Sequence, residues 1–283
     1  MEQKNNLSRL IESLDKKEKL VVMLAPSFVV DFSYPSIILA LKKVGFDKVV
    51  EVTFGAKMIN REYHKKLKNS KELVIATVCP GIVELVKNKF PEHTKKLIDV
   101  DSPMSATAKI CKKTYPQHKI VFISPCNFKK IEARKSNKID FVINYLELKK
   151  LLKLKKIKVN KKIKIGFDKF YNDYTKIYPL AGGLSKTAHL KKILPEEQIK
   201  ITDGVKNVSG FLENPDKQIK FLDATFCKGS CIGGPCVNSK LPLFFRRRRV
   251  LKYLKKSKQE DIPDEKKGLI EEAKGINFRT SPI

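Results

Sequence analysis

The sequence of 283 residues contains no tryptophan, only four histidines and no long hydrophobic run. Its longest apolar stretch, Leu20 to Val30, is interrupted by Pro26 and Ser27, whereas a membrane-spanning helix needs about 20 apolar residues. The first residues also lack the basic segment and apolar core of a secretory signal. We therefore expect no membrane span and a location in the reducing cytoplasm.

Acidic residues are scarce relative to basic ones, and the formal net charge is +29. Such an excess is typical of proteins that bind nucleic acid or another acidic surface. However, only eight of the 59 basic residues are arginines, and sequence-specific nucleic-acid contacts favour the bidentate guanidinium group. The composition therefore does not favour a nucleic-acid partner, which stays an alternative.

Short apolar runs alternate with helix-like segments along the chain. Runs without polar alternation indicate strands that are buried on both faces, as in a mostly parallel sheet covered by helices. Seven such runs between helices predict an α/β fold. They are residues 20–24, 48–53, 73–78, 119–124, 141–144, 163–167 and 220–224.

The strand-like runs lie within residues 19–242, which we expect to form the main domain. Residues 1–18 have leucines at helical spacing and predict an N-terminal surface helix. Residues 243–283 predict a basic helix and a polar tail, with a short helix from Asp264 to Lys274. The arginines of the basic helix either meet an acidic partner or only solubilise a helix that docks through Phe244 and Leu251.

The chain has six cysteines and no paired Cys-x2-Cys of the kind that zinc sites use. A chain of this size needs no disulfide scaffold, and clustered cysteines in a reducing compartment are more often metal ligands or redox groups. Cys111 lies within a helix-like segment and is expected to be a buried apolar side chain. The sequence leaves the role of Cys236 open.

Three cysteines, Cys79, Cys126 and Cys227, each follow an apolar run. They therefore lie at the carboxyl ends of predicted strands, where α/β sheets build their sites. Cys231 follows Cys227 on a glycine-rich loop. Four thiolates without a nearby histidine suit an iron-sulfur cluster. Spacing alone leaves open the alternative that each is a buried small apolar side chain.

Three motifs together resemble the cluster-binding signatures of the iron-iron ([FeFe]) hydrogenase large subunit, C-terminal H-cluster domain family, in the same order. They are Thr77-Val78-Cys79-Pro80, the segment Pro125 to Glu132, and the segment Cys227 to Gly234. Segments Ala25-Pro26-Ser27 and Ala181-Gly182-Gly183 also have counterparts, so the resemblance covers about residues 19 to 250. It implies two α/β lobes of mostly parallel twisted sheet flanked by helices, with an iron-sulfur site in the crevice between them.

In that family a [4Fe-4S] cubane is bridged through one cysteine to a di-iron unit with CO and CN ligands, and the whole is the H-cluster. The resemblance implies that Cys79, Cys126, Cys227 and Cys231 hold the cubane, with Cys231 as the bridge. It also implies that Ala25, Pro26, Gly182 and Gly183 bind the cofactor.

The resemblance further implies roles for three polar side chains. Lys129 would donate a hydrogen bond to one cyanide, and Ser27 to the other. A cyanide on iron is an anionic acceptor, which a charge-assisted donor stabilises best in a dry pocket. Glu132 would belong to the acidic proton relay.

The sequence departs from the family pattern in the groups that move protons. Active members carry a proton-relaying cysteine where this chain has Val78, and valine cannot bind or release a proton. Glu62 stands near one family glutamate, but Lys57 replaces an expected acid. Ser124 and Thr225 replace the usual methionines. Turnover is therefore expected to be slow, or the role to be that of a hydrogen sensor.

Three functions remain open: a slow hydrogenase or hydrogen sensor, a cubane-only iron-sulfur assembly protein, and a nucleic-acid-binding protein with a structural cluster. The chain lacks the Cys-x2-Cys-x2-Cys runs of extra clusters. Electrons therefore come from a ferredoxin-like carrier or a partner redox subunit, or they are not supplied at all. Cluster maturation proteins are further expected partners. We also expect Cys79 and Cys126 to share one lobe, with the first strand and residues after about 163 in the other.

Overall fold

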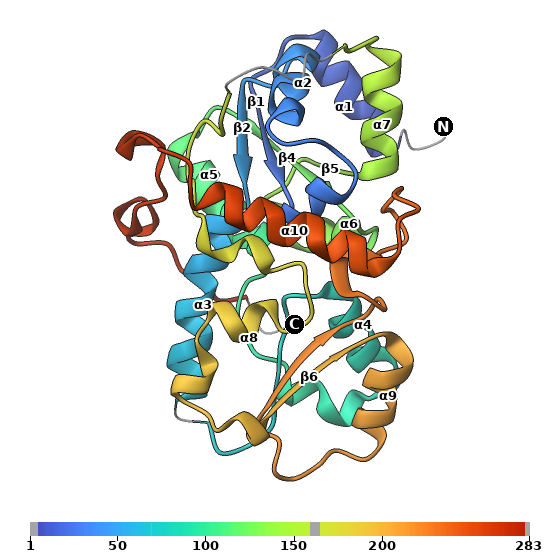
Figure 1. Ribbon diagram of the computed structural model, residues 1–283, viewed down its shortest axis with the longest axis vertical. Helices are drawn as coiled ribbons and strands as arrows, with labels where there is room; N and C mark the ends of the chain where they lie inside the picture. Colours follow the sequence, from blue (N-terminus) through green and yellow to red (C-terminus); the bar gives the residue numbers. More distant parts are fainter. Residues whose placement is uncertain (1–4, 69, 159–164, 281–283) are drawn as a thin grey trace.

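The computed structural model describes residues 5–68, 70–158 and 165–280. Two lobes are stacked along the long axis of the molecule, and each is built on its own parallel sheet (Figure 1). This arrangement confirms the predicted α/β class. Within the described ranges, no helix is long and apolar enough to cross a membrane.

The first lobe contains a four-stranded sheet in the order β2-β1-β4-β5. Its strands are β1 (Leu20–Leu24), β2 (Lys48–Glu51), β4 (Lys119–Ser124) and β5 (Phe141–Asn144), all parallel. All five residues of β1 are buried, and Val22 lies opposite both Val49 and Val121. The apolar run of β1 thus follows from its central place in the sheet.

Helices cover both faces of this sheet. The apolar core on one face includes Leu20, Val22 and Leu24 of β1, with α1 (Asn6–Asp15), α2 (Ser36–Val44) and α7 (Tyr145–Leu154). Val21 and Met23 face the other core, with α3 (Thr53–Leu67) and α5 (Pro103–Thr114). This alternation of side chains is the two-residue period of a strand. The remaining helix of this lobe, α6 (Phe128–Ser136), connects β4 to β5.

The second lobe contains the three-stranded parallel sheet β3-β7-β6. Its strands are β3 (Val74–Ile75), β6 (Ile199–Asp203) and β7 (Phe221–Thr225). Ile75 and Leu222 pack in one core with α4 (Pro80–Lys89) and α9 (Val205–Glu213). Leu184 of the short helix α8 (Gly183–Thr187) lies in the core shared with α3.

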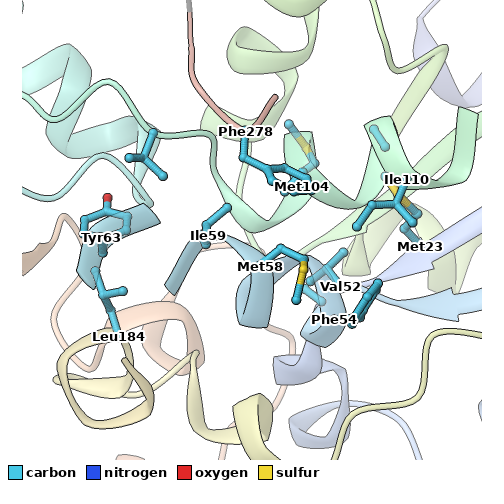
Figure 2. Packing of buried hydrophobic residues seen from close by; sticks show 14 of the residues in the cluster. Met23, Val52, Phe54, Met58, Ile59, Tyr63, Met104, Ile110, Leu184 and Phe278 are labelled. Atoms are coloured by element: carbon cyan, nitrogen blue, oxygen red, sulfur yellow. The ribbon is translucent and has the colours of Figure 1, made fainter. Parts of the chain in front are cut away.

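Helix α3 joins the cores of the two lobes. Figure 2 shows Phe54 and Met58 of this helix at one end of the cluster, and Tyr63 near Leu184 at the other. The ring of Tyr63 meets that of Phe221 of β7 edge to face, at 5.9 Å between centroids. The lobes therefore share one apolar core, which limits their movement against each other.

Helix α10 (Leu243–Ser257) crosses the molecule at the junction of the lobes (Figure 1). Its inward face consists of Arg246, Val250, Tyr253 and Ser257, at helical spacing. Phe244 and Leu251 are 64% and 41% exposed. Docking through Phe244 and Leu251 is therefore wrong, because these two residues lie on the opposite side of the helix.

The predicted division of the lobes is also wrong. Cys79 follows β3 of the second lobe, whereas Cys126 follows β4 of the first, and β1 pairs with β4 instead of with late strands. The reason is that the path of the chain between strands decides which strands become neighbours. After β2 the chain crosses to the second sheet, where β3 pairs with β7, and it returns to the first sheet with β4.

Several element boundaries also differ from the prediction. The run 73–78 forms only the short β3, and the half-exposed strand β6 was missed because its polar residues hide the pattern. Residues 165–167 of the predicted run 163–167 are not a strand, and the rest lies outside the described residues. Asp264 to Lys274 forms two separate 3-10 turns, at Asp264–Lys266 and Ile270–Ala273.

Candidate iron-sulfur site

A cavity of about 100 Å³ lies where strands of both sheets end. Three of the predicted cysteines line it, one after β3, one after β4 and one on the glycine-rich loop after β7. The residues of the three motifs that line it are Val78, Cys79, Pro80, Pro125, Cys126, Lys129 and Cys231. Ala25, Pro26 and Ser27 of the loop after β1 line it too, as do Ser124 and Thr225. The cavity lies in the crevice that the resemblance implies.

Cys227 does not line the cavity, but its thiol lies close enough to the others to interact with them. Burial raises the pKa of Cys227 to about 12, with further contributions from Cys126 and Cys79. Burial also raises the pKa of Cys231, and Cys79, Cys126 and Cys227 add to that rise. All four thiols therefore belong to one electrostatic group drawn from separate segments of the chain.

The thiol group fits a cationic iron-sulfur core. The four cysteines are half-buried. Their thiolates would repel one another, since neighbouring cysteines add to the raised pKa values of Cys126, Cys227 and Cys231. The raised pKa values favour the protonated thiol. A bound metal ion reverses this preference, since a coordinating thiol is deprotonated outright. All six cysteines of the chain are free of disulfides, so the four thiols are available as ligands. Within the described ranges, no three His, Cys, Asp or Glu side chains form a site for a single metal ion.

The glycine-rich loop brings Cys231 close to the cavity through tight backbone contacts. Gly229 has a φ of +80°, which favours glycine, and a Cβ atom at Gly233 would lie 1.9 Å from the carbonyl oxygen of Lys228. The backbone N–H of Cys231 donates to the carbonyl of Pro179, at 3.1 Å. Only glycine permits this packing, so the loop holds Cys231 in a fixed position.

Lys129 and Glu132 lie one turn apart on α6 and connect the cavity with a second one. The Lys129 Nζ lies 2.6 Å from a Glu132 carboxylate oxygen and 3.5 Å from the carbonyl oxygen of Val78. The hydroxyl groups of Ser102 and Ser105 donate to the other Glu132 oxygen. Glu132 and both serines line a separate cavity of about 520 Å³. A polar chain thus leads away from the cysteine cavity.

Ser27 is fully buried in the 3-10 turn Pro26–Val30 after β1. Its hydroxyl lies 2.6 Å from the hydroxyl of Tyr145, which also donates to the carbonyl of Ala25 at 3.2 Å. Burial raises the pKa of Tyr145 well above the usual value. Sequence reasoning missed Tyr145, because a tyrosine after an apolar run looks like an ordinary core residue.

Other predicted residues lie outside the cavity. Gly182 and Gly183 follow Tyr178 and Pro179, which line it, and a Cβ atom at Gly183 would lie 2.5 Å from the carbonyl oxygen of Ile177. Glu62 lines a third cavity and pairs with Lys65 at 3.0 Å. Lys57 lies over the ring of Phe54.

The two remaining cysteines differ in their surroundings. Cys111 is fully buried in the apolar core around α5, as predicted. Cys236 is 3% exposed. Burial raises its pKa, and the charges of Lys130 and Glu147 act on it in opposite directions.

Residues 18–235 match the family described as "Iron only hydrogenase large subunit, C-terminal domain". The chain belongs to this family. Iron hydrogenase 1 of Clostridium pasteurianum is 27% identical over 320 aligned residues, which cover 85% of this chain and 54% of that protein. The cytosolic Fe-S cluster assembly factor NAR1 of Kluyveromyces lactis is 26% identical over 160 residues, covering 50% of this chain and 34% of that protein. The chain thus spans about half the length, or less, of these relatives.

Solved structures share the fold of this family member. The [FeFe]-hydrogenase HydA1 from Chlamydomonas reinhardtii matches in two variants with TM-scores of 0.63 and 0.65. HydA(deltaEFG), from a structure on stepwise H-cluster assembly, matches with a TM-score of 0.64. Each is 14% identical and covers 94% of this chain and 90% of its own. The likeness establishes the fold of the two lobes.

Proposed function

We propose that this iron-hydrogenase family member binds a [4Fe-4S] cubane through Cys79, Cys126, Cys227 and Cys231. The same proposal gives it a di-iron unit with CO and CN ligands, beside Ser27 and Lys129. When bound, this H-cluster supplies the redox chemistry that interconverts protons and dihydrogen. The chain would work slowly or as a hydrogen sensor, in a reducing compartment such as the cytoplasm, with help from cluster maturation proteins.

The observation that carries the proposal is the cavity that Ser27 and Lys129 share with Cys79, Cys126 and Cys231. The Lys129 side chain is 13% exposed and Ser27 is fully buried. A bare cubane makes no use of a buried ammonium group and a buried hydroxyl. An anionic cyanide does, because a charge-assisted hydrogen bond in a dry site is strong.

The second candidate function is that of a cubane-only assembly protein, which two observations favour. Val78 stands beside the cavity without a titratable group, and the NAR1 relative is named as an Fe-S cluster assembly factor. In this case the four thiols would hold the cubane, while Lys129 and Glu132 would form only a structural ion pair.

Reconstitution separates the two candidates. The purified chain is loaded first with iron and sulfide and then with a synthetic di-iron precursor that carries CO and CN. Our proposal expects two further irons per chain and infrared bands of metal-bound CO and CN, which Lys129→Met weakens. Stable cubane without those bands would support the assembly protein instead. Loss of cubane in Cys231→Ser, but not in Cys236→Ser, tests the ligand set in either case.

A further inference from the structure

The hydroxyl group of Tyr145 makes a buried hydrogen bond with that of Ser27. Both side chains are fully buried, and their oxygens lie 2.6 Å apart. Within the described ranges, no other side chain makes a hydrogen bond with the Ser27 hydroxyl. Ser27 lines the cysteine cavity, whereas Tyr145 does not. An effect of the Tyr145 hydroxyl on a group in the cavity therefore has to pass through Ser27.

The start of α7 holds the Tyr145 side chain in place. Tyr145 is the first residue of this helix, and the preceding Asn144 forms a capping box with Glu147. The Asn144 amide also donates to the side chain of Asn127 at 3.0 Å. Asn127 directly follows Cys126. The segment that carries one of the four thiols thus also fixes the helix end that carries Tyr145.

Two arrangements of the hydroxyl hydrogens fit these contacts, because a hydroxyl donates one hydrogen and has two acceptor lone pairs. In the first, Ser27 donates to Tyr145, and Tyr145 donates to the carbonyl of Ala25 at 3.2 Å. In the second, Tyr145 donates to Ser27, whose own hydrogen can then be directed to an acceptor in the cavity. Only the second arrangement makes Ser27 a donor toward a bound anion.

The second arrangement leaves each of these buried groups with a hydrogen-bond partner. The carbonyl of Ala25 also accepts from the backbone N–H of Phe28 at 2.9 Å, so it keeps a partner when Tyr145 donates to Ser27 instead. An unsatisfied buried carbonyl would be costly. Burial raises the pKa of Tyr145 well above its usual value, so the hydroxyl keeps the hydrogen that it donates.

We propose that Tyr145 is a positioning residue for the di-iron unit. It donates to Ser27 and thereby directs the Ser27 hydrogen to an anionic ligand in the cavity. This inference rests on the proposed function, in which that ligand is a cyanide on iron. Hydrogen bonds in a chain polarise one another, so donation by the phenol strengthens the donation by Ser27. Tyr145 thus tunes a hydrogen bond that it does not itself make.

The test combines Tyr145→Phe with Ser27→Ala. Phenylalanine keeps the ring that meets Phe32 edge to face at 5.7 Å between centroids, so only the hydroxyl is lost. Each protein is loaded with iron and sulfide and then with a limiting amount of the synthetic di-iron precursor. Infrared CN bands and di-iron occupancy are measured. The control is Tyr171→Phe, which removes a hydroxyl that donates to the carbonyl of Ser257 at 2.6 Å.

We expect the CN band that shifts in Ser27→Ala to shift in the same direction, and by less, in Tyr145→Phe. Occupancy should fall about 10-fold in Ser27→Ala, which loses a hydrogen bond to a charged group, and about 3-fold in Tyr145→Phe. In the double variant, the loss of Tyr145 should add nothing to the loss of Ser27, because one acts through the other. Tyr171→Phe should equal the wild type. Additive shifts in the double variant would overturn the inference.

A second measurement does not need the Tyr145 variant to fold. Tyrosine labelled with an isotope at the carbon that bears the hydroxyl has a carbon–oxygen stretching band that depends on whether the hydroxyl accepts a hydrogen bond. In the wild type this band should shift when the di-iron unit is loaded onto the cubane protein, because Tyr145 then stops accepting from Ser27. Ser27→Ala should abolish the shift. A hydrogen bond that only ties α7 to the turn Pro26–Val30 would give the same band before and after loading.

Failure of this inference can be told apart from failure of the proposed function. CN bands in the wild type that Tyr145→Phe leaves unchanged, in a variant with full cubane content, would refute the role of Tyr145 alone. The absence of CN bands from a wild-type protein that holds its cubane would refute the proposed function and, with it, this inference.

Discussion

The ammonium group of Lys129 lies 2.6 Å from the carboxylate of Glu132, at the boundary between the two cavities. Both side chains are mostly buried, at 13% and 19% exposed. The hydroxyl groups of Ser102 and Ser105 hold the carboxylate from the other side. Glu132 therefore positions Lys129 toward the cysteine cavity.

The first prediction concerns Glu132→Gln. The neutral amide keeps the shape but loses the charge that orients Lys129. We expect loading of the di-iron unit to fall about 10-fold, as loss of an outer partner often costs in metal sites, while the cubane stays. Infrared CN bands and iron counts measure this. The control is Glu84→Gln, since Glu84 makes an ion pair of the same 2.6 Å length with the half-exposed Lys135 and should have no effect.

Cys111 provides a second prediction, on stability. Its side chain is fully buried in an apolar core, and burial raises the pKa of its thiol. Cys111→Ser brings a hydroxyl group into that core, so we expect a loss of about 1 to 3 kcal/mol in the free energy of unfolding. Urea unfolding measures the loss. The iron content of the variant should equal that of the wild type. Loss of iron in the variant would instead identify Cys111 as a ligand.

Sequence patterns predicted the strand ends better than the pairing of strands. An apolar run followed by Cys126 or Cys227 marks the carboxyl end of a strand, because the backbone leaves the sheet there. The pattern carries no information on which strands become neighbours. The paths of the crossovers decide that, and so Cys79 was assigned to the wrong lobe.

Contacts between side chains far apart in the sequence could not be predicted from it either. The Ser27 hydroxyl meets that of Tyr145, 118 residues later in the chain. Which face of α10 points inward depends on its contact with the 3-10 turn Pro26–Val30. There the Arg249 guanidinium donates to the carbonyl of Val30 at 2.6 Å. Both faces of α10 carry apolar and basic residues, so residue types alone did not show which face is buried.

A buried ion pair carries the third prediction. The Lys176 ammonium group donates to the Glu51 carboxylate, and both side chains are essentially unexposed. The Tyr253 hydroxyl of α10 donates to the other Glu51 oxygen at 3.0 Å. Lys176→Met leaves a buried carboxylate without a counter-charge, so we expect a loss of about 3 to 5 kcal/mol in the free energy of unfolding at pH 7. The double variant Lys176→Met/Glu51→Gln should recover most of it, as denaturant unfolding would measure.

The loss in Lys176→Met should depend on pH in a defined direction. Burial raises the pKa of Glu51, and the charge of Lys176 opposes this rise. Without Lys176 the folded-state pKa is higher still, so the folded protein binds a proton that the unfolded chain releases above about pH 4.3. The variant therefore loses stability as the pH rises from that value toward the folded-state pKa, and then no further. Equal losses at pH 4.5 and pH 8 would contradict this explanation.

The last prediction concerns the proton path. Val78 lines the cysteine cavity, and its carbonyl oxygen lies 3.5 Å from the Lys129 Nζ. Val78→Cys adds a titratable thiol at this point and is nearly conservative in volume. A positioned proton-transfer group contributes about 10²- to 10⁴-fold, so hydrogen evolution per loaded cluster should rise by that order. Val83→Cys, at the edge of the 520 Å³ cavity, is the control and should give no gain.

The onward route from residue 78 can be tested in the same variant. Glu62 lines a different cavity and pairs with Lys65, whereas Glu132, Ser102 and Ser105 form a continuous polar chain to the 520 Å³ cavity. Ser102→Ala/Ser105→Ala should therefore abolish the gain of Val78→Cys, and Glu62→Gln should leave it. If a fully loaded Val78→Cys protein shows no gain, the proton does not pass through position 78. If only Glu62→Gln removes the gain, the path runs along α3, and the serines serve to hold Glu132 against Lys129.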